Sequence, residues 1–152
     1  MDEEKIIIRH AREGDLKEIL KLVCELIEIL NNKECVDLNY VPDNLKKIFK
    51  ENNAYFLVAE EEGDVVGFAH FTTRLTILHP GPSAVVEEIA VKADRRGEGI
   101  GEKLLNAIAE NCNNIGCSEI EVSTEKANEQ AREFYRKLGF SEDAVLFEKH
   151  LT

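Results

Sequence analysis

The stretch ADRRGEGIGEKLL, residues 93–105, places two arginines and three alternating glycines directly before a helix that carries leucines. A helix N-terminus presents unpaired N–H groups and a partial positive charge, and glycines allow an anion to approach the backbone closely. The stretch therefore predicts a phosphate-binding turn, although the glycines alone also fit a purely structural turn. Two common phosphate loops do not fit, because the Walker pattern and the dinucleotide fingerprint, counted from Gly97, both need a glycine where Glu102 stands.

Strand-like and helix-like patterns alternate on both sides of this turn. Apolar residues alternate or cluster, as in strands, over residues 5–9, 55–60, 65–78, 84–91, 118–124 and 144–151. They recur with a helical period over residues 16–30, 42–50, 100–115 and 128–138. Asp15 is expected to cap the first helix, and Gly63-Asp64 is expected at the turn of a hairpin. The order predicts one mixed α/β domain over residues 1–152, with a meander in the first half of its sheet.

The composition excludes several classes of protein. The 152 residues include 19 Lys and Arg against 30 Asp and Glu, a net charge of −11 that argues against nucleic-acid binding. No apolar run approaches the ~18 residues of a membrane span, and the start MDEEKIIIRH is too charged for a signal peptide. The four cysteines show no CxxC spacing and no histidine cluster, so we expect free thiols and no metal. The sequence predicts a cytoplasmic protein that binds neither nucleic acid nor membranes.

Two motifs in order carry a resemblance to a known family. Arg96-Gly97-Glu98-Gly99-Ile100-Gly101, after a strand that ends at Val91, resembles the acetyl-CoA loop of the GNAT superfamily of N-acetyltransferases. NEQAREFYRKLGF, residues 128–140, is similar to the superfamily signature N..A..FY.K.GF, and IIIRHAREGDLKEILKL, residues 6–22, resembles its usual opening. The resemblance implies the GNAT fold, a mixed α/β fold with a mostly antiparallel sheet of about six to seven strands flanked by about four helices. It also implies an acetyl-CoA-dependent N-acetyltransferase.

The resemblance also implies how the cosubstrate acetyl-CoA is held. The N–H groups of the glycine turn would bind the pyrophosphate at the helix N-terminus. The edge of the preceding strand would bind the pantetheine arm like an added strand, and an asparagine of the second motif would contact the cofactor. The implied cofactor-binding residues are Ile89, Ala90, Val91, Arg96, Gly97, Glu98, Gly99, Ile100, Gly101, Glu102 and Asn128.

Three residues are candidates for the chemistry. Tyr135 occupies the superfamily's usual general-acid position and would protonate the sulfur of CoA. Glu87 and Glu88 interrupt an apolar strand, where an uncompensated carboxylate is costly, and one of them is the candidate base. Since neighbouring strand residues point to opposite faces, we expect one of the two to face the acceptor. A resemblance to polyamine and glucosamine-phosphate acetyltransferases favours Glu87, and the choice stays open. His70 fits a core histidine better than an acceptor-channel residue.

The expected reaction is direct attack of a primary amine of a small molecule on acetyl-CoA. Two alternatives are a protein N-terminal or lysine acetyltransferase and a non-catalytic acyl-CoA binding domain. The second would need neither Tyr135 nor an acidic strand residue, and both are present, so the sequence favours an enzyme. A homodimer is one assembly that is compatible with the sequence.

Overall fold

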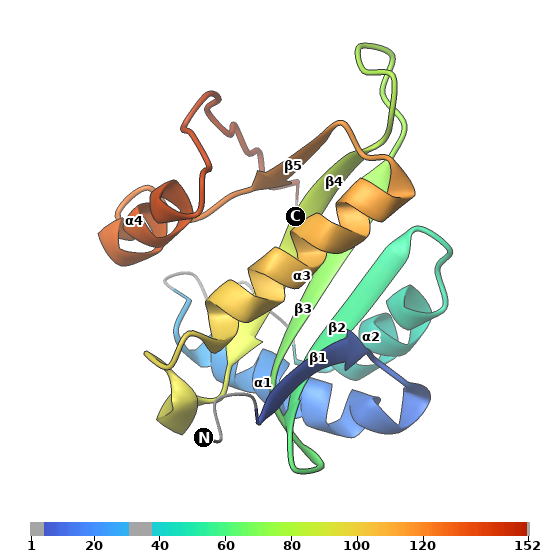
Figure 1. Ribbon diagram of the computed structural model, residues 1–152, viewed down its shortest axis with the longest axis vertical. Helices are drawn as coiled ribbons and strands as arrows, with labels where there is room; N and C mark the ends of the chain where they lie inside the picture. Colours follow the sequence, from blue (N-terminus) through green and yellow to red (C-terminus); the bar gives the residue numbers. More distant parts are fainter. Residues whose placement is uncertain (1–4, 31–37, 152) are drawn as a thin grey trace. The chain divides into compact units, whose positions relative to one another are not determined.

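A computed structural model describes residues 5–30 and 38–151, and the chain forms two compact units, Met1–Glu121 and Val122–Thr152. In the first unit, four strands form an antiparallel meander, and a short fifth strand follows the fourth (Figure 1). In spatial order they are β1 (Ile6–His10), β2 (Ala54–Glu61), β3 (Asp64–Arg74), β4 (Ser83–Val91) and β5 (Glu119–Val122).

Helices cover both faces of this sheet. α1 (Leu16–Glu28) and α2 (Val41–Phe49) pack on one face, and α3 (Ile100–Ile115) crosses the other (Figure 1). α4 (Glu129–Lys137) is the helix of the second unit. The mixed α/β class and the four α-helices formed by the described residues confirm the fold class predicted from the sequence.

The number of strands differs from the prediction. The described residues form five strands instead of six to seven, and residues 144–151, expected as a closing strand, are not a strand. A strand is stabilised by hydrogen bonds to a partner strand. The second unit has α4 as its main regular element and supplies no such partner among its described residues. The apolar side chains Val145, Leu146, Phe147 and Leu151 are accordingly exposed.

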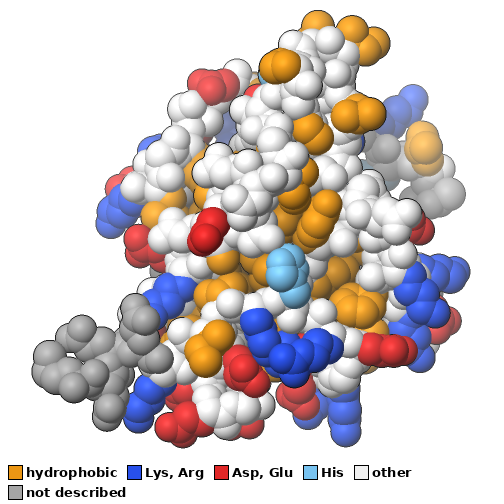
Figure 2. Space-filling model, turned by 45° about the vertical axis from the view of Figure 1, so that its right-hand side comes forward, with side chains coloured by type: hydrophobic (Ala, Val, Ile, Leu, Met, Phe, Trp, Pro, Cys, Tyr) orange, Lys and Arg blue, Asp and Glu red, His pale blue; other side chains and the backbone are white. Residues whose placement is uncertain are grey.

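The β2–β3 hairpin turns one residue earlier than expected. Glu62 and Gly63 both have positive φ, 49° and 89°, which is the pattern of a two-residue type I′ turn. β3 ends at Arg74, four residues before the predicted end. Leu75, Ile77 and Leu78 lie instead in the connection between β3 and β4, where all three are exposed. This connection is the loop at the top of Figure 1, and Figure 2 shows hydrophobic side chains at the top of the molecule.

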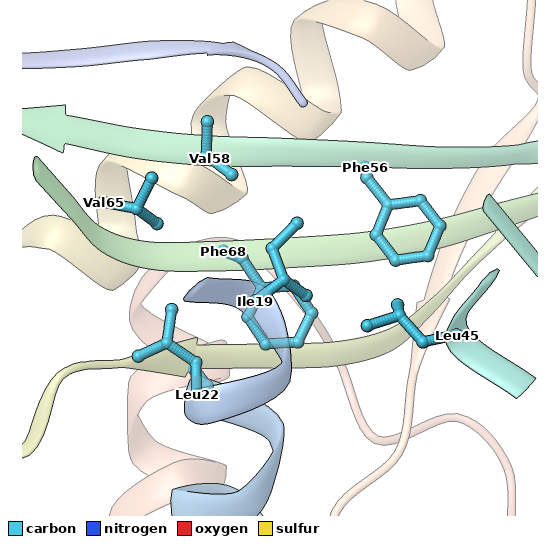
Figure 3. Close-up of a cluster of buried hydrophobic side chains, with 8 residues drawn as sticks. Ile19, Leu22, Leu45, Phe56, Val58, Val65 and Phe68 are labelled. Atoms are coloured by element: carbon cyan, nitrogen blue, oxygen red, sulfur yellow. The ribbon is translucent and has the colours of Figure 1, made fainter. Parts of the chain in front are cut away.

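The core on the α1 face joins the two helices to the strands. Ile19 and Leu22 of α1 pack with Leu45 of α2 against Phe56 and Phe68 of the sheet (Figure 3). Burying such side chains contributes about 1.5–3 kcal/mol each, which makes this cluster a main source of stability for the first unit.

Asp15 does not cap α1 through its side chain, contrary to the expectation. Its carboxylate accepts hydrogen bonds from the Arg9 guanidinium at 2.8 and 3.0 Å and from the Arg12 N–H at 2.7 Å. These hydrogen bonds hold the pKa of Asp15 below its ordinary value. The residue therefore ties β1 to the turn before α1.

A glycine of β3 sets the distance between the sheet and α3. A Cβ added at Gly67 would lie 3.2 Å from the Ala90 carbonyl oxygen and 3.3 Å from both Ile100 and Leu104. These contacts are tighter than a side chain normally makes, so the missing Cβ lets the first turn of α3 approach β3 and β4 closely. The N-terminus of α3 is thereby fixed beside the end of β4.

Candidate active site

The glycine turn has the geometry of an anion site. Gly97 and Gly99 have φ of 81° and 84°, and a Cβ at either position would meet nothing within 4 Å. Among the described residues, no side chain caps the N-terminus of α3, so the N–H groups of its first turn, from Ile100 to Glu102, have no side-chain acceptor there. Open space, a bare backbone and a helix N-terminus together fit a phosphate group.

The two arginines of the turn have different partners. The Arg95 guanidinium donates to Glu61 at 2.8 and 3.1 Å and to Glu98 at 3.0–3.2 Å. These hydrogen bonds hold the pKa of Glu61 below its ordinary value. Arg96 donates from Nε to the Val91 carbonyl oxygen at 3.2 Å, which leaves its remaining N–H groups beside the turn. Arg95 thus neutralises two carboxylates next to the anion site, and the sequence pattern had not revealed this role.

We predict that Arg95→Ala weakens binding of CoA about fivefold, because Glu98 would then stand unpaired beside the phosphates. The double variant Arg95→Ala/Glu98→Ala should recover most of the loss. Isothermal titration calorimetry at low and high salt measures both effects. Equal affinities of the double variant and Arg95→Ala would contradict the prediction.

The strand edge expected to bind the pantetheine arm is the part of β4 that β5 does not reach. The two strands meet at the start of β4, where the Ser118 N–H donates to the Pro82 carbonyl at 2.8 Å and Ser83 Oγ donates to Glu119 at 3.1 Å. β5 has four residues, too few to run from there to residues 89–91 in either direction. Among the described residues of the first unit, this edge is therefore open to an extended ligand.

A β-bulge brings both candidate bases to one face of the sheet. His70 pairs with Glu88 and Phe71 pairs with Val86, so Glu87 is an extra residue on β4. Glu87 accepts a hydrogen bond from Thr72 Oγ1 at 3.1 Å, and Glu88 lies 2.7 Å from His70 Nδ1. His70 and Thr72 alternate with Phe71 and so share a face. The expectation that strict alternation sends one glutamate to each face is therefore wrong.

His70 is a buried residue of β3, as expected of a core histidine, and it contacts Glu88. Its ring is 4% exposed and stacks on Phe56 with a centroid distance of 4.3 Å. Its Nδ1 faces Glu88, whereas Nε2 is buried and has no hydrogen-bond partner in the part of the chain that the structure describes. Sequence reasoning gave His70 little weight because one histidine in an apolar strand is ambiguous. The adjacent acids Glu87 and Glu88 in the next strand are the sequence feature that could have indicated a bulge and a polar partner for His70.

The second unit holds the remaining two candidates. Asn128 caps α4, since its Oδ1 accepts a hydrogen bond from the Ala131 N–H at 3.0 Å. Tyr135 is half-buried, and its ring contacts Phe134 and Phe140 at centroid distances of 5.3 and 5.7 Å. Burial raises the pKa of Tyr135 above its ordinary value, so its phenol carries a proton throughout the neutral range.

Two further findings concern metals and membranes. In residues 5–30 and 38–151, no group of three or more His, Cys, Asp or Glu side chains is arranged to hold a metal ion. Within the same residues, no helix combines the length and the apolar character that crossing a bilayer demands.

The chain matches the model of the Acetyltransferase (GNAT) family over residues 10–140 and belongs to that family. It is 26% identical over 144 residues to the aminoalkylphosphonate N-acetyltransferase of Salmonella typhimurium, covering 95% of this chain and 90% of the relative. It is 30% identical over 142 residues to the thialysine N-epsilon-acetyltransferase of Bos taurus, covering 88% of this chain and 83% of the relative. A crystal structure of a possible acetyltransferase from Clostridium difficile 630 has a TM-score of 0.87 at 25% identity, covering 98% and 99% of the two chains.

The protein is thus an acetyl-CoA-dependent N-acetyltransferase, and acetyl-CoA is its cosubstrate. This confirms the family, the enzyme class and the cosubstrate predicted from the two motifs.

Proposed function

We propose that the enzyme acetylates the primary amine of a small molecule, or an amine at the end of a short flexible chain. The observation that carries the proposal is the bulge in β4, which directs the carboxylates of Glu87 and Glu88 to one face. Two carboxylates attract a protonated amine and can accept its proton. Two relatives are named as N-acetyltransferases of aminoalkylphosphonates and of thialysine. These names support a small amine as the acceptor.

In this proposal acetyl-CoA, which supplies the activated acetyl group, is held by the turn and the strand edge. The N–H groups of residues 97–102 and the Arg96 side chain hold its phosphates. The backbone of residues 89–91 binds its pantetheine arm. The uncapped helix, the open space at Gly97 and Gly99, and the short β5 support this arrangement. Asn128 uses its side-chain oxygen to cap α4, so its amide nitrogen is the group left for the cofactor.

The chemistry needs one base and one acid. A carboxylate of Glu87 or Glu88 first takes one proton from the bound ammonium and passes it to solvent. The neutral amine then attacks the acetyl carbon, and the same carboxylate takes a second proton from the nitrogen as the nitrogen–carbon bond forms. The carbon–sulfur bond breaks, and Tyr135 gives its phenolic proton to the departing sulfur, so that the products are the amide and the free thiol. The carboxylate then releases its proton to solvent, and Tyr135 regains one. The raised pKa of Tyr135, caused by burial, supports its role as acid because the donor form is kept.

The acceptor class is tested by following CoA release with a panel of amines. The panel contains 2-aminoethylphosphonate, thialysine, a polyamine, a D-amino acid, an amino sugar and two peptides that offer an N-terminus or a lysine. We expect the best small amine to exceed both peptides in kcat/KM by at least about tenfold, because two carboxylates recognise a compact cation without an extended peptide groove. A preferred peptide would instead identify a protein acetyltransferase.

The proposal extends to the cellular location and the oligomeric state of the enzyme. We propose a cytoplasmic enzyme, which the free thiols of Cys24, Cys112 and Cys117 support. We propose a homodimer as its assembly, and the exposed Leu75, Ile77 and Leu78 support an apolar contact surface.

A further inference from the structure

We infer that His70 is a positioning residue that makes Glu88, rather than Glu87, the proton acceptor for the amine. The inference rests on the proposed function, since it selects one of the two carboxylates named there. Its starting point is the 2.7 Å contact between His70 Nδ1 and Glu88 Oε1.

The chemistry of the pair fixes the direction of the hydrogen bond. An ionised carboxylate can only accept, so Nδ1 carries the proton and donates it to Glu88. Nε2 is then the ring's lone-pair nitrogen, and it is buried with no hydrogen-bond partner among residues 5–30 and 38–151. A second proton there would create a buried N–H with no acceptor, which is more costly than an unmatched lone pair. The geometry therefore favours the tautomer in which Nδ1 donates to Glu88.

The surroundings hold the imidazole in place. The ring lies in the central strand β3, stacks on Phe56 of β2 with an interplanar angle of 4°, and is 4% exposed. Glu88 is hydrogen-bonded to this fixed group through Oε1, while its side chain is 40% exposed. The other oxygen, Oε2, has no hydrogen-bond partner in the described part of the chain, and it is available to a bound amine.

Glu87 is held less firmly. It is the extra residue of the bulge, it is exposed, and a single threonine hydroxyl donates to it at 3.1 Å. A base acts efficiently when its orientation is fixed before the substrate binds. The bulge therefore gives the two glutamates different tasks: Glu88 accepts the proton, and Glu87 adds negative charge that attracts the amine.

Among the residues that the structure describes, few charged groups face His70. β4 contributes Glu88 and, beyond it, Glu87, while β2 contributes Phe56. The helices on this face contribute apolar side chains to the adjoining cluster, namely Ile19, Leu22 and Leu45. Glu25 of α1 reaches the far end of β4, where it accepts a hydrogen bond from the Ala93 N–H.

The test compares four variants in steady-state kinetics with the best amine of the panel, between pH 6 and 10. We expect Glu88→Gln to lower kcat about 100-fold near neutral pH and to recover partly at high pH, where free amine is abundant. Glu87→Gln should cost about threefold, mainly in KM. His70→Leu, which removes the donor, should lower kcat about 30-fold, and His70→Asn, which restores an N–H near the Nδ1 position, should regain most of it.

The opposite ranking of the two glutamates, or an unchanged kcat in folded His70→Leu, would overturn the inference. If His70→Leu does not fold, a loss in His70→Asn as large as in Glu88→Gln overturns it equally. A measurement without turnover separates this inference from the proposed function. Two-bond proton–nitrogen correlation spectra of the 15N-labelled wild-type protein should show that Nδ1 of His70 is protonated and that Nε2 is not. The reverse tautomer would refute the proposed hydrogen bond from His70 to Glu88. Absence of turnover with every amine would refute the proposed function instead.

Discussion

Gly99→Val is expected to weaken CoA binding by more than about 100-fold while the rest of the fold is retained. Gly99 has a φ of 84°, and the space where its Cβ would stand is open to the proposed phosphate position. A branched side chain there fills that space and moves the turn out of the left-handed region, which removes at least two hydrogen bonds to a charged group. At about 1.5 kcal/mol for each such bond, the loss corresponds to two orders of magnitude in affinity.

The chain offers a matched control at the other end of the same helix. Gly116 ends α3 with a φ of 92°, and a Cβ there would also meet nothing within 4 Å. Gly116→Val therefore carries similar backbone strain at a distance from the turn, and it should lower the melting temperature without changing CoA affinity. Calorimetric titration of both variants decides the matter. Equal affinities of Gly99→Val and the wild type would show that the phosphates bind elsewhere.

Tyr135→Phe is expected to lower kcat about 100-fold with little change in affinity for acetyl-CoA. The substitution keeps the ring that contacts Phe134 and Phe140 and removes only the hydroxyl. Because burial raises the pKa of Tyr135, the wild-type enzyme should not lose activity through ionisation of this phenol until the pH exceeds its ordinary value of about 10.

Single-turnover measurements are needed here, since slow product release would hide an effect on chemistry. Tyr55→Phe is the matched control, because Tyr55 stacks on Phe71 at 4.8 Å in the first unit and has no proposed role in catalysis. If both substitutions leave the single-turnover rate unchanged, the proton for the sulfur comes from water or from another group.

The sequence predicted most of the fold because its signals were local. The helical period and Gly116 fixed the whole of α3, and the prolines at 80 and 82 marked the break before β4. The hairpin was placed one residue off, since the propensities of Glu62 and Asp64 do not distinguish which of them enters the turn. The predicted strand at residues 144–151 failed because the pairing of a strand depends on a partner that its own residues do not specify.

The candidate site was predicted in part. The glycine turn could be predicted directly from the sequence, because its left-handed backbone conformation favours residues without a Cβ. The pairing of Arg95 with Glu61 joins residues 34 positions apart, and that of His70 with Glu88 joins residues 18 apart. The first depends on where the turn after β4 lies relative to β2, and the second depends on the register of β3 and β4. The bulge at Glu87 shifts that register, and a strict two-residue period cannot represent such a shift.

The absence of a side chain at Gly67 has a consequence for how a ligand is received. Since α3 touches β3 and β4 there, the helix N-terminus and the open strand edge belong to one stiff body. A long ligand that contacts both therefore finds their separation already set, and little of its binding energy is consumed in ordering the protein. Such a receptor is preorganised, so its selectivity for ligand length follows from the packing of α3 against the sheet.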